Sequence, residues 1–169
     1  INISGNAFTP GAGKQIDGTA GGAGTAVTAL SSSQAYVAYQ KATAGTVRGR
    51  VIDIVSSVVN ESAEAVADSV ASRGQFIRAV KVSATKVLIA HRANSDNKIQ
   101  LRIESISGST PSATGTTLNL ADMQGAIAQF GLTVMSANRA VVITSFGDRS
   151  VYDFMVLLID ISGTSPVLV

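Results

Sequence analysis

The stretch "LRIESISGSTP" (residues 101–111) decides how the rest of the chain is read, because it recurs. It returns as "VLLIDISGTSP" (156–166) and, more diverged, as "RVIDIVSS" (50–57). Ile54, Ile106 and Ile161 therefore lie in register, 52 and 55 residues apart. The opening "INISGNAFTP" supplies a fourth copy, in which Ile3 precedes Ile54 by 51 residues. Self-similarity at such a period indicates a repeat architecture.

A second anchor keeps the same phase. It reads "SSSQAYVAY" (31–39), "SATKVLIAH" (83–91) and "SANRAVVIT" (136–144), with its first serines 52 and 53 residues apart. The distance from this serine to the isoleucine anchor is 23, 23 and 25 residues in the three units. The pattern predicts a single repeat domain over 1–169. It consists of an outer strand and Gly-rich loop (1–24) and three repeats (25–75, 76–129 and an incomplete 130–169).

Each repeat divides into four segments of strand character. The first two are short and rich in β-branched residues, as in 76–83 and 86–92. The third is longest and alternates apolar and polar residues, as in 98–107. The fourth is predicted at "KQIDGTAG" (14–21), "SAEAVADSV" (62–70) and "GTTLNLADM" (115–123). The middle copy has a helix-like Ala and Glu content, but its place in the repeat favours an edge strand. The third repeat is expected to lack its fourth strand.

Four antiparallel strands in a unit of about 52 residues are typical of a β-propeller blade. The predicted fold is therefore all-β, with three four-stranded blades; a β-solenoid and a β-sandwich are the alternatives. Known propellers have about 4 to 8 blades, so three cannot close a ring. We expect the ring to be completed by other copies of the chain, two of which make six blades, or by other parts of a longer chain.

The segments "AYVAYQKATAGTVRGRVIDIV", "KVLIAHRANSDNKIQLRIESISGSTP" and "RAVVITSFGDRSVYDFMVLLIDISGTSP" resemble propeller-like repeats of bacteriophage tail-fibre and other virion proteins, and of some bacterial surface proteins. Those repeats combine a "VAYRD" strand, a loop with "NS" and a strand that ends in "SG" before Thr or Pro. Here the loop survives as Asn94-Ser95, and the other two have diverged to "ATAG" (42–45) and "FGDRS" (146–150). The resemblance implies a structural or attachment role on a virion or at a cell surface.

Composition narrows the function classes. Hydrophobic residues make up 46% of the chain and charged residues 14%, which fits a globular domain with a sizeable core. The net charge is only +2 and the basic residues are scattered, so a nucleic-acid partner is not expected. No apolar run approaches the roughly 18 to 20 residues of a membrane span, so membrane insertion is not expected either. The chain has no cysteine and therefore no disulfide framework.

Motifs of catalysis are weak. "GAGK" (11–14) fails the phosphate-loop pattern, because Phe8 stands where a glycine is needed and Gln15 where Ser or Thr is needed. His91 is the only histidine, and the chain lacks tryptophan, which the repeated box of sialidase propellers requires. Paired Asp-x-Asp calcium loops are missing as well. We therefore predict no catalytic residue, no metal, no cofactor and no enzymatic activity.

Loops between the second and third strands are the predicted binding sites, because loops on a rigid scaffold commonly carry function. The leading hypothesis is an attachment module of a virion appendage that contacts a host-surface glycan or other receptor. The alternative is an oligomeric lectin, but sugars usually stack on aromatic rings, and the only tyrosines are Tyr36, Tyr39 and Tyr152. At least one of Tyr36 and Tyr39 is expected in the core. A glycosidase-like propeller enzyme is the third functional hypothesis. The candidate binding residues are Arg92, Asn94, Ser95, Asp96, Asn97, Asp148 and Arg149.

Overall fold

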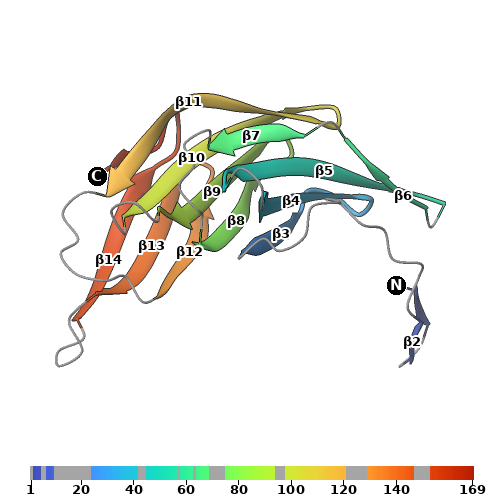
Figure 1. The fold of residues 1–169 in the computed structure, drawn as a ribbon, viewed down its shortest axis with the longest axis horizontal. Coiled ribbons are helices and arrows are strands. Elements are labelled where there is room, and N and C mark those ends of the chain that lie inside the picture. Colours follow the sequence, from blue (N-terminus) through green and yellow to red (C-terminus); the bar gives the residue numbers. More distant parts are fainter. Residues whose placement is uncertain are drawn as a thin grey trace.

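Three antiparallel sheets follow one another in sequence order, after a two-stranded N-terminal hairpin (Figure 1). The structure, a computed structural model, describes residues 2–4, 7–9, 24–41, 45–56, 58–62, 64–68, 75–93, 98–120, 129–146 and 153–169. Every regular element within these ranges is a β-strand. The predicted all-β class and its three units are therefore confirmed.

The first sheet has a divided outer edge. Its order is β3-β4-β5-β6, and β7 also pairs with β5. Since β6 lies opposite Ile52–Val55 and β7 opposite Val47–Gly49, the two short strands together fill the fourth position. The Ala- and Glu-rich segment is thus an edge strand, as predicted. The bounds are β3 (Thr25–Ala29), β4 (Gln34–Gln40), β5 (Val47–Val55), β6 (Val58–Glu61) and β7 (Ala65–Asp68).

The second and third sheets repeat the same order of strands. The second contains β8 (Gln75–Ser83), β9 (Lys86–Arg92), β10 (Ile99–Ser107) and β11 (Thr110–Leu120). The third contains β12 (Gln129–Ser136), β13 (Arg139–Phe146), β14 (Asp153–Asp160) and β15 (Val167–Leu168).

Two expectations about the fourth strands were wrong. In the second sheet the fourth strand begins at Thr110, well before the predicted Gly115, because the turn after β10 contains only Gly108 and Ser109. The third repeat does have a fourth strand, since β15 pairs with Ile159 and Asp160. In the second sheet the two-residue turn returns the chain directly to its neighbour, where the backbone groups pair at once, whereas in the third sheet residues 161–166 separate the two strands.

The outer edge is irregular at the same place in two sheets. The pairing of β10 with β11 shifts register between Leu101 and Ile103. The break between β6 and β7 lies opposite Gly49 to Val51, the repeat-equivalent positions. Gly115 lies in the irregular part of β11 with φ +71°, and a Cβ there would lie 2.4 Å from the Thr164 carbonyl oxygen. Both the backbone angle and the contact with the third sheet require glycine.

The N-terminal hairpin is a fourth copy of the repeat turn. It consists of β1 (Asn2–Ser4) and β2 (Ala7–Thr9), in which Ile3 lies opposite Phe8. Ile106 lies opposite Pro111 with the same separation. The opening residues therefore have the backbone pairing of the end of a third strand, as predicted. The strand expected at 14–21 lies outside the described residues.

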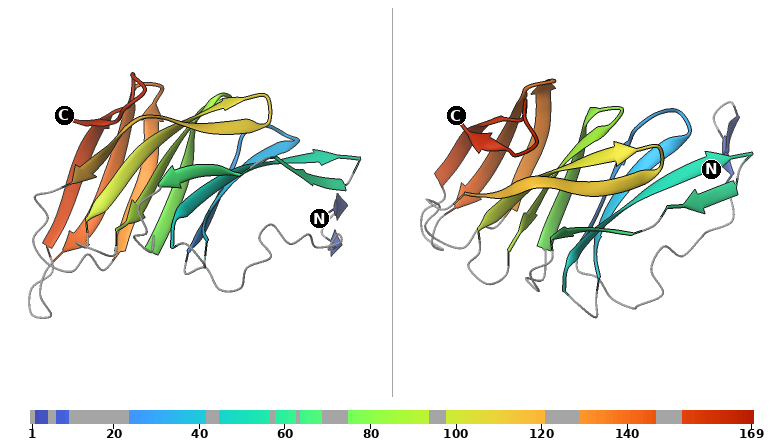
Figure 2. Two further views of the ribbon diagram at one scale, coloured as in Figure 1. Left: turned by 45° about the horizontal axis from the view of Figure 1, so that its top comes forward. Right: turned by 90° about the horizontal axis from the view of Figure 1, so that it is seen from above.

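The three sheets stack face to face. Both β3 and β12 contact β8, so the first strands of the three units lie side by side (Figure 2). We call the face of a sheet that is turned toward the next sheet in sequence its forward face, and the opposite one its backward face. The second sheet is covered on both, and five consecutive residues of β9 are buried.

Equivalent repeat positions form both junctions. The first junction buries Tyr36, Ala38, Val47 and Val51 of the first sheet against Ile77, Val87, Ile89 and Ile106 of the second. The second junction buries Leu88, Ala90, Ile99, Leu101 and Ile103 against Phe130, Ala140, Val142, Ile159 and Ile161. Burial of these side chains is the main source of stability between the sheets.

Ser56→Gly is expected to raise the free energy of unfolding by about 0.5–1 kcal/mol. Ser56 has φ 50°, a left-handed conformation in which a Cβ is unfavourable, and the repeat-equivalent residue is Gly108 at φ 58°. The reverse change, Gly108→Ser, is the matched control and should cost a similar amount, since a Cβ there meets nothing within 4 Å. Urea denaturation measures both, and equal stabilities of all three proteins contradict the strain.

Candidate functional site

At each junction, polar contacts hold the connection between the third and fourth strands of the following sheet. At the first junction, the Asp53 carboxylate accepts hydrogen bonds from Gln34 Nε2 at 2.7 Å and from Ser109 Oγ at 2.5 Å. Ser109 lies in the turn between β10 and β11. The carboxylate therefore joins the end of β5 to the turn of the next sheet.

The second junction repeats this arrangement with different chemistry. Lys86, the repeat-equivalent of Gln34, donates from Nζ to the Gly163 carbonyl oxygen at 3.0 Å. Gly163 lies in the turn between β14 and β15, which is equivalent to the turn that carries Ser109. In addition, the Thr116 backbone N–H donates to Ser165 Oγ at 2.9 Å. The start of the second strand thus contacts the following turn at both junctions, through Gln34 and Ser109 at the first and through Lys86 and Gly163 at the second.

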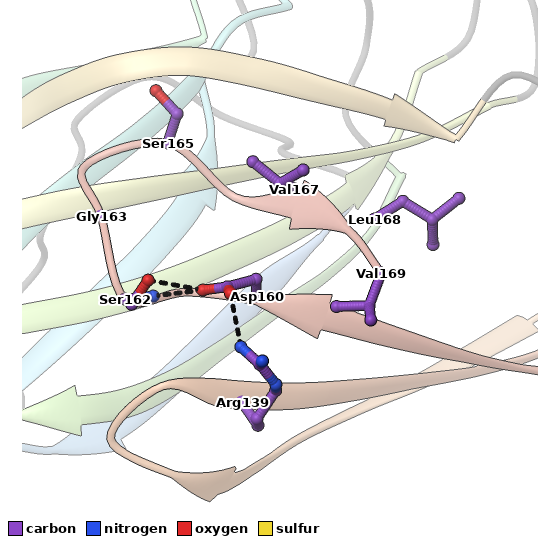
Figure 3. A pocket seen from close by; sticks show the side chains of 8 residues that line it. All are labelled: Arg139, Asp160, Ser162, Gly163, Ser165, Val167, Leu168 and Val169. Carbon is purple, nitrogen blue, oxygen red and sulfur yellow. Dashed lines mark hydrogen bonds and ion pairs between the residues drawn. The ribbon is translucent and has the colours of Figure 1, made fainter.

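Arg139 and Asp160 occupy these positions in the third sheet, where they border a cavity of about 430 Å³ (Figure 3). They come from β13 and β14, which pair so that the two residues lie directly opposite each other. The C-terminal segment forms the other wall. The lining residues are Arg139, Asp160, Ser162, Gly163, Ser165, Val167, Leu168 and Val169.

The Asp160 carboxylate is held in its charged form. Its Oδ1 accepts from Ser162 Oγ at 2.7 Å and from the Ser162 backbone N–H at 2.8 Å, and Oδ2 accepts from Arg139 Nη1 at 2.5 Å. These bonds, those of Ser162 foremost, lower the pKa of Asp160 to about 2. At neutral pH the cavity therefore presents an ion pair and hydroxyl groups beside an apolar wall. Such a lining suits a polar turn flanked by apolar side chains.

A second charged cluster lies on the backward face of the first sheet. Tyr39 Oη donates to Glu64 at 2.6 Å, Lys41 Nζ lies 3.0 Å from Glu64, and Arg50 pairs with Glu61 at 2.8 Å. Burial is the main cause that raises the pKa of Tyr39 to about 12. Burial also acts to raise the pKa of Glu64, but the bonds from Tyr39 and Lys41 outweigh it and lower that pKa. Because the charges satisfy one another, the cluster joins β4 and β5 to the outer edge of the sheet.

A buried polar pair distinguishes the first junction from the second. Tyr36 Oη donates to Glu104 Oε2 at 2.6 Å, and neither residue is exposed. Burial raises the pKa of both groups. Gly49 makes the space, because a Cβ there would lie 1.8 Å from Tyr36 Oη. At the second junction the equivalents of Tyr36, Gly49 and Glu104 are apolar: Leu88, Leu101 and Ile159.

One of the predicted binding residues is placed by the structure. Arg92 lies at the end of β9, and its guanidinium carbon is 5.7 Å from the centroid of the Phe76 ring. Arg92 and Arg139 lie at opposite ends of their units, because Arg139 is the repeat-equivalent of Lys86 at the start of β9. The other six residues, Asn94, Ser95, Asp96, Asn97, Asp148 and Arg149, lie outside the described ranges.

The remaining candidates are interior residues. His91 is buried in β9, and Tyr36 and Tyr39 are both buried, which exceeds the expectation of at least one. The sequence reasoning missed Arg139 and Asp160. The alignment of the repeats carried the signal, since "SANR" places Arg139 directly after a repeated turn, like Gln34, and "IDIS" places Asp160 directly before another, like Asp53.

Two features are absent from the residues that the structure describes. These residues include no group of three or more His, Cys, Asp or Glu side chains arranged to hold a metal ion. They also include no helix of the length and apolarity needed to cross a membrane.

Comparisons with models of protein families, with curated proteins and with solved structures found no match to this chain.

Proposed function

We propose that the chain is a non-enzymatic structural and attachment module of the β-propeller type, belonging to a virion appendage such as a tail fibre or spike. The observation that carries this proposal is the repeated stacking of the sheets. Equivalent faces meet at both junctions, and the first strands of the three units lie side by side. Blades around a propeller axis stack in this way.

The strand pairing favours a propeller over the two alternatives. In each unit the strands follow one another outward from first to fourth, and all pairs are antiparallel. A parallel β-helix pairs its coils in parallel, and a sandwich has two sheets, whereas here the middle sheet is covered on both faces. Further blades supplied by other chains or by a longer chain complete the ring in this proposal.

Attachment is assigned to the loops between the second and third strands. Polar residues of these loops, Arg92 and the segment 94–97 among them, are proposed to contact a host-surface glycan or other receptor. A lectin that relies on aromatic stacking is the weaker candidate, because Tyr36 and Tyr39 are buried and cannot stack on a sugar. The proposed location is a virion or an extracellular surface.

Immunogold electron microscopy with an antibody against residues 1–169 tests the proposed role. Gold is expected on appendages of particles or on the cell surface, and label confined to the cytosol contradicts the proposal. In parallel, the purified chain should bind a receptor glycan on an array without turning over fluorogenic glycosides. Asn97→Ala should weaken that binding about 10-fold, as expected when one polar contact with the glycan is removed. The matched change Asn138→Ala, in a turn at the other end of the strands, should not.

A further inference from the structure

The forward face of the third sheet exposes five large apolar side chains. Their exposed fractions range from 38% for Leu158 to 78% for Phe154, and the set is Met135, Ile143, Phe154, Val156 and Leu158. They come from the first three strands of the sheet and therefore form one patch. A contiguous apolar patch of this kind marks an interaction surface.

The same five positions are covered in the two preceding sheets. In the first sheet the equivalents are buried: Leu30, Ala38, Val47, Gly49 and Val51. In the second sheet Val82 is partly buried and Ala90, Ile99, Leu101 and Ile103 are fully buried. In both cases the cover is the backward face of the following sheet. The patch on the third sheet is thus a stacking face whose partner sheet lies outside this chain's own three.

The backward face of the first sheet is uncovered as well. Beside its charged cluster of Tyr39, Lys41, Arg50, Glu61 and Glu64, it exposes positions whose equivalents are covered in the later sheets. Val27 is 68% exposed and Ile54 is 48% exposed, while their equivalents in the later sheets are covered. Thr25 is exposed, and Ala35 and Val37 are half-buried. The equivalents of these last three are buried in both later sheets: Ile77 and Phe130, Val87 and Ala140, Ile89 and Val142.

We infer that the forward face of the third sheet binds the backward face of the first sheet in a second copy of this chain. The inference rests on the propeller-type module proposed above and names what completes it. The contact is head to tail, with different surfaces on the two copies. Two copies joined by two such contacts form a closed ring of six sheets. This number lies within the range of about 4 to 8 blades known for propellers.

The residues at the two faces fit each other better than they fit the other sheets. At the two junctions within the chain, the backward-face residue equivalent to Ile52 is Glu104 in the second sheet and Ile159 in the third. Glu104 is buried because the Tyr36 hydroxyl donates a hydrogen bond to it. On the forward face of the third sheet the residue equivalent to Tyr36 is Val141, whose side chain cannot donate one. Ile52, which is only 7% exposed in the single chain, therefore brings no unpaired charge to that contact. Phe154, larger than Val47 and Ile99, meets a face on which Thr25 replaces Ile77 and Phe130.

The Arg139–Asp160 cavity receives a turn in the same arrangement. At the first junction the equivalents of both residues, Gln34 and Asp53, contact the turn between the third and fourth strands of the following sheet, and at the second junction Lys86, the equivalent of Arg139, does so. In the second copy this turn lies between β5 and β6 and includes Ser56. Its flanking residues, Val55 and Val58, are exposed and apolar, which matches the wall formed by Val167, Leu168 and Val169.

Sedimentation equilibrium of residues 1–169 over a concentration series tests the contact. The mass should rise from 17.2 kDa to twice that value. Val156→Glu on the forward face and Val27→Glu on the backward face should each weaken association by about 100-fold or more, since each places a charge in an apolar contact. Ala84→Glu, in an exposed turn of the second sheet, is the control and should associate like the wild type. A wild-type chain that stays monomeric overturns the inference.

Mixing the variants separates the head-to-tail contact from a symmetric one. The Val156→Glu chain keeps an unaltered backward face, and the Val27→Glu chain keeps an unaltered forward face. These two faces can bind each other, so an equimolar mixture should form a one-to-one dimer through one intact junction. If Val27→Glu alone remains dimeric, two forward faces bind each other and the inference is wrong. Thermal melts by circular dichroism check that both variants fold, and the milder pair Val156→Ser and Val27→Ser replaces any variant that does not.

The two proposals fail separately. A monomeric chain whose antibody still labels an appendage retains the proposed function and removes this interface. A dimeric chain with antibody label confined to the cytosol does the reverse.

Discussion

Gly49→Ala should lower the free energy of unfolding by about 3 kcal/mol. Gly49 is buried in the middle of β5, and its Cβ position lies 1.8 Å from Tyr36 Oη and 2.9 Å from Glu104 Oε2. Neither side chain can withdraw, because both are fully buried between the first two sheets. Gly131→Ala in β12 is the matched control, because a Cβ at Gly131 would approach no atom closer than 4.0 Å. Chemical denaturation measures both.

The loss should be recovered by copying the second junction into the first. There the equivalents of Gly49, Tyr36 and Glu104 are Leu101, Leu88 and Ile159, all buried without a polar group. The triple variant Gly49→Ala, Tyr36→Leu, Glu104→Val makes the first junction apolar like the second, and the smaller side chain at position 36 offsets the methyl group added at position 49. It is therefore expected to unfold within about 1.5 kcal/mol of the wild type, as volume-conserving core changes do. A single Gly49→Ala variant as stable as the wild type contradicts the packing described here.

Tyr36→Phe is expected to cost about 1–3 kcal/mol at neutral pH, because it removes the hydroxyl that donates to the buried Glu104 carboxyl. The second oxygen, Oε1, has no hydrogen-bond partner within the described residues. The Glu104 carboxyl then has even less to stabilise its charge. In the wild type the Tyr36 hydroxyl stays protonated, and so can donate, throughout the pH range of the measurement, because burial raises the pKa of Tyr36 well above 10.0.

The pH dependence has a definite sign. Burial raises the pKa of Glu104 above its ordinary value of 4.5, so the folded protein binds the proton more tightly than the unfolded chain. The stability from this group is complete below pH 4.5 and is lost as pH rises through the folded pKa. The Tyr36 hydrogen bond acts to lower that pKa, so its removal raises the pKa further, and the deficit of Tyr36→Phe should grow with pH.

Urea denaturation of Tyr36→Phe and wild type from pH 4 to 9 measures this deficit. Glu104→Gln is the control: in that background the cost of Tyr36→Phe should not vary with pH. A deficit that is the same at every pH in the Glu104 protein means that the carboxyl is not the group responsible.

The repeat period in the sequence was sufficient to predict the organisation of the fold. The serine anchors lie at the turns between first and second strands, and Ile54, Ile106 and Ile161 mark the ends of the third strands. Starts of the fourth strands were less predictable, because a two-residue turn such as Gly108-Ser109 leaves no composition change between strands. The binding loops were proposed from polarity alone, and the polar pair at the opposite end, Arg139 and Asp160, was missed.

The sequence by itself determined that the chain is a series of equivalent antiparallel sheets, each with two apolar faces, because a strand repeats its side-chain direction every second residue. Only the tertiary structure decided which faces are covered. Ala90 and Ile143 hold the same place in the repeat, yet one is buried and the other is 48% exposed. Likewise Tyr36 and Glu104 meet across 68 positions of sequence. Burial depends on the neighbouring sheet, and strand periodicity carries no information about that neighbour.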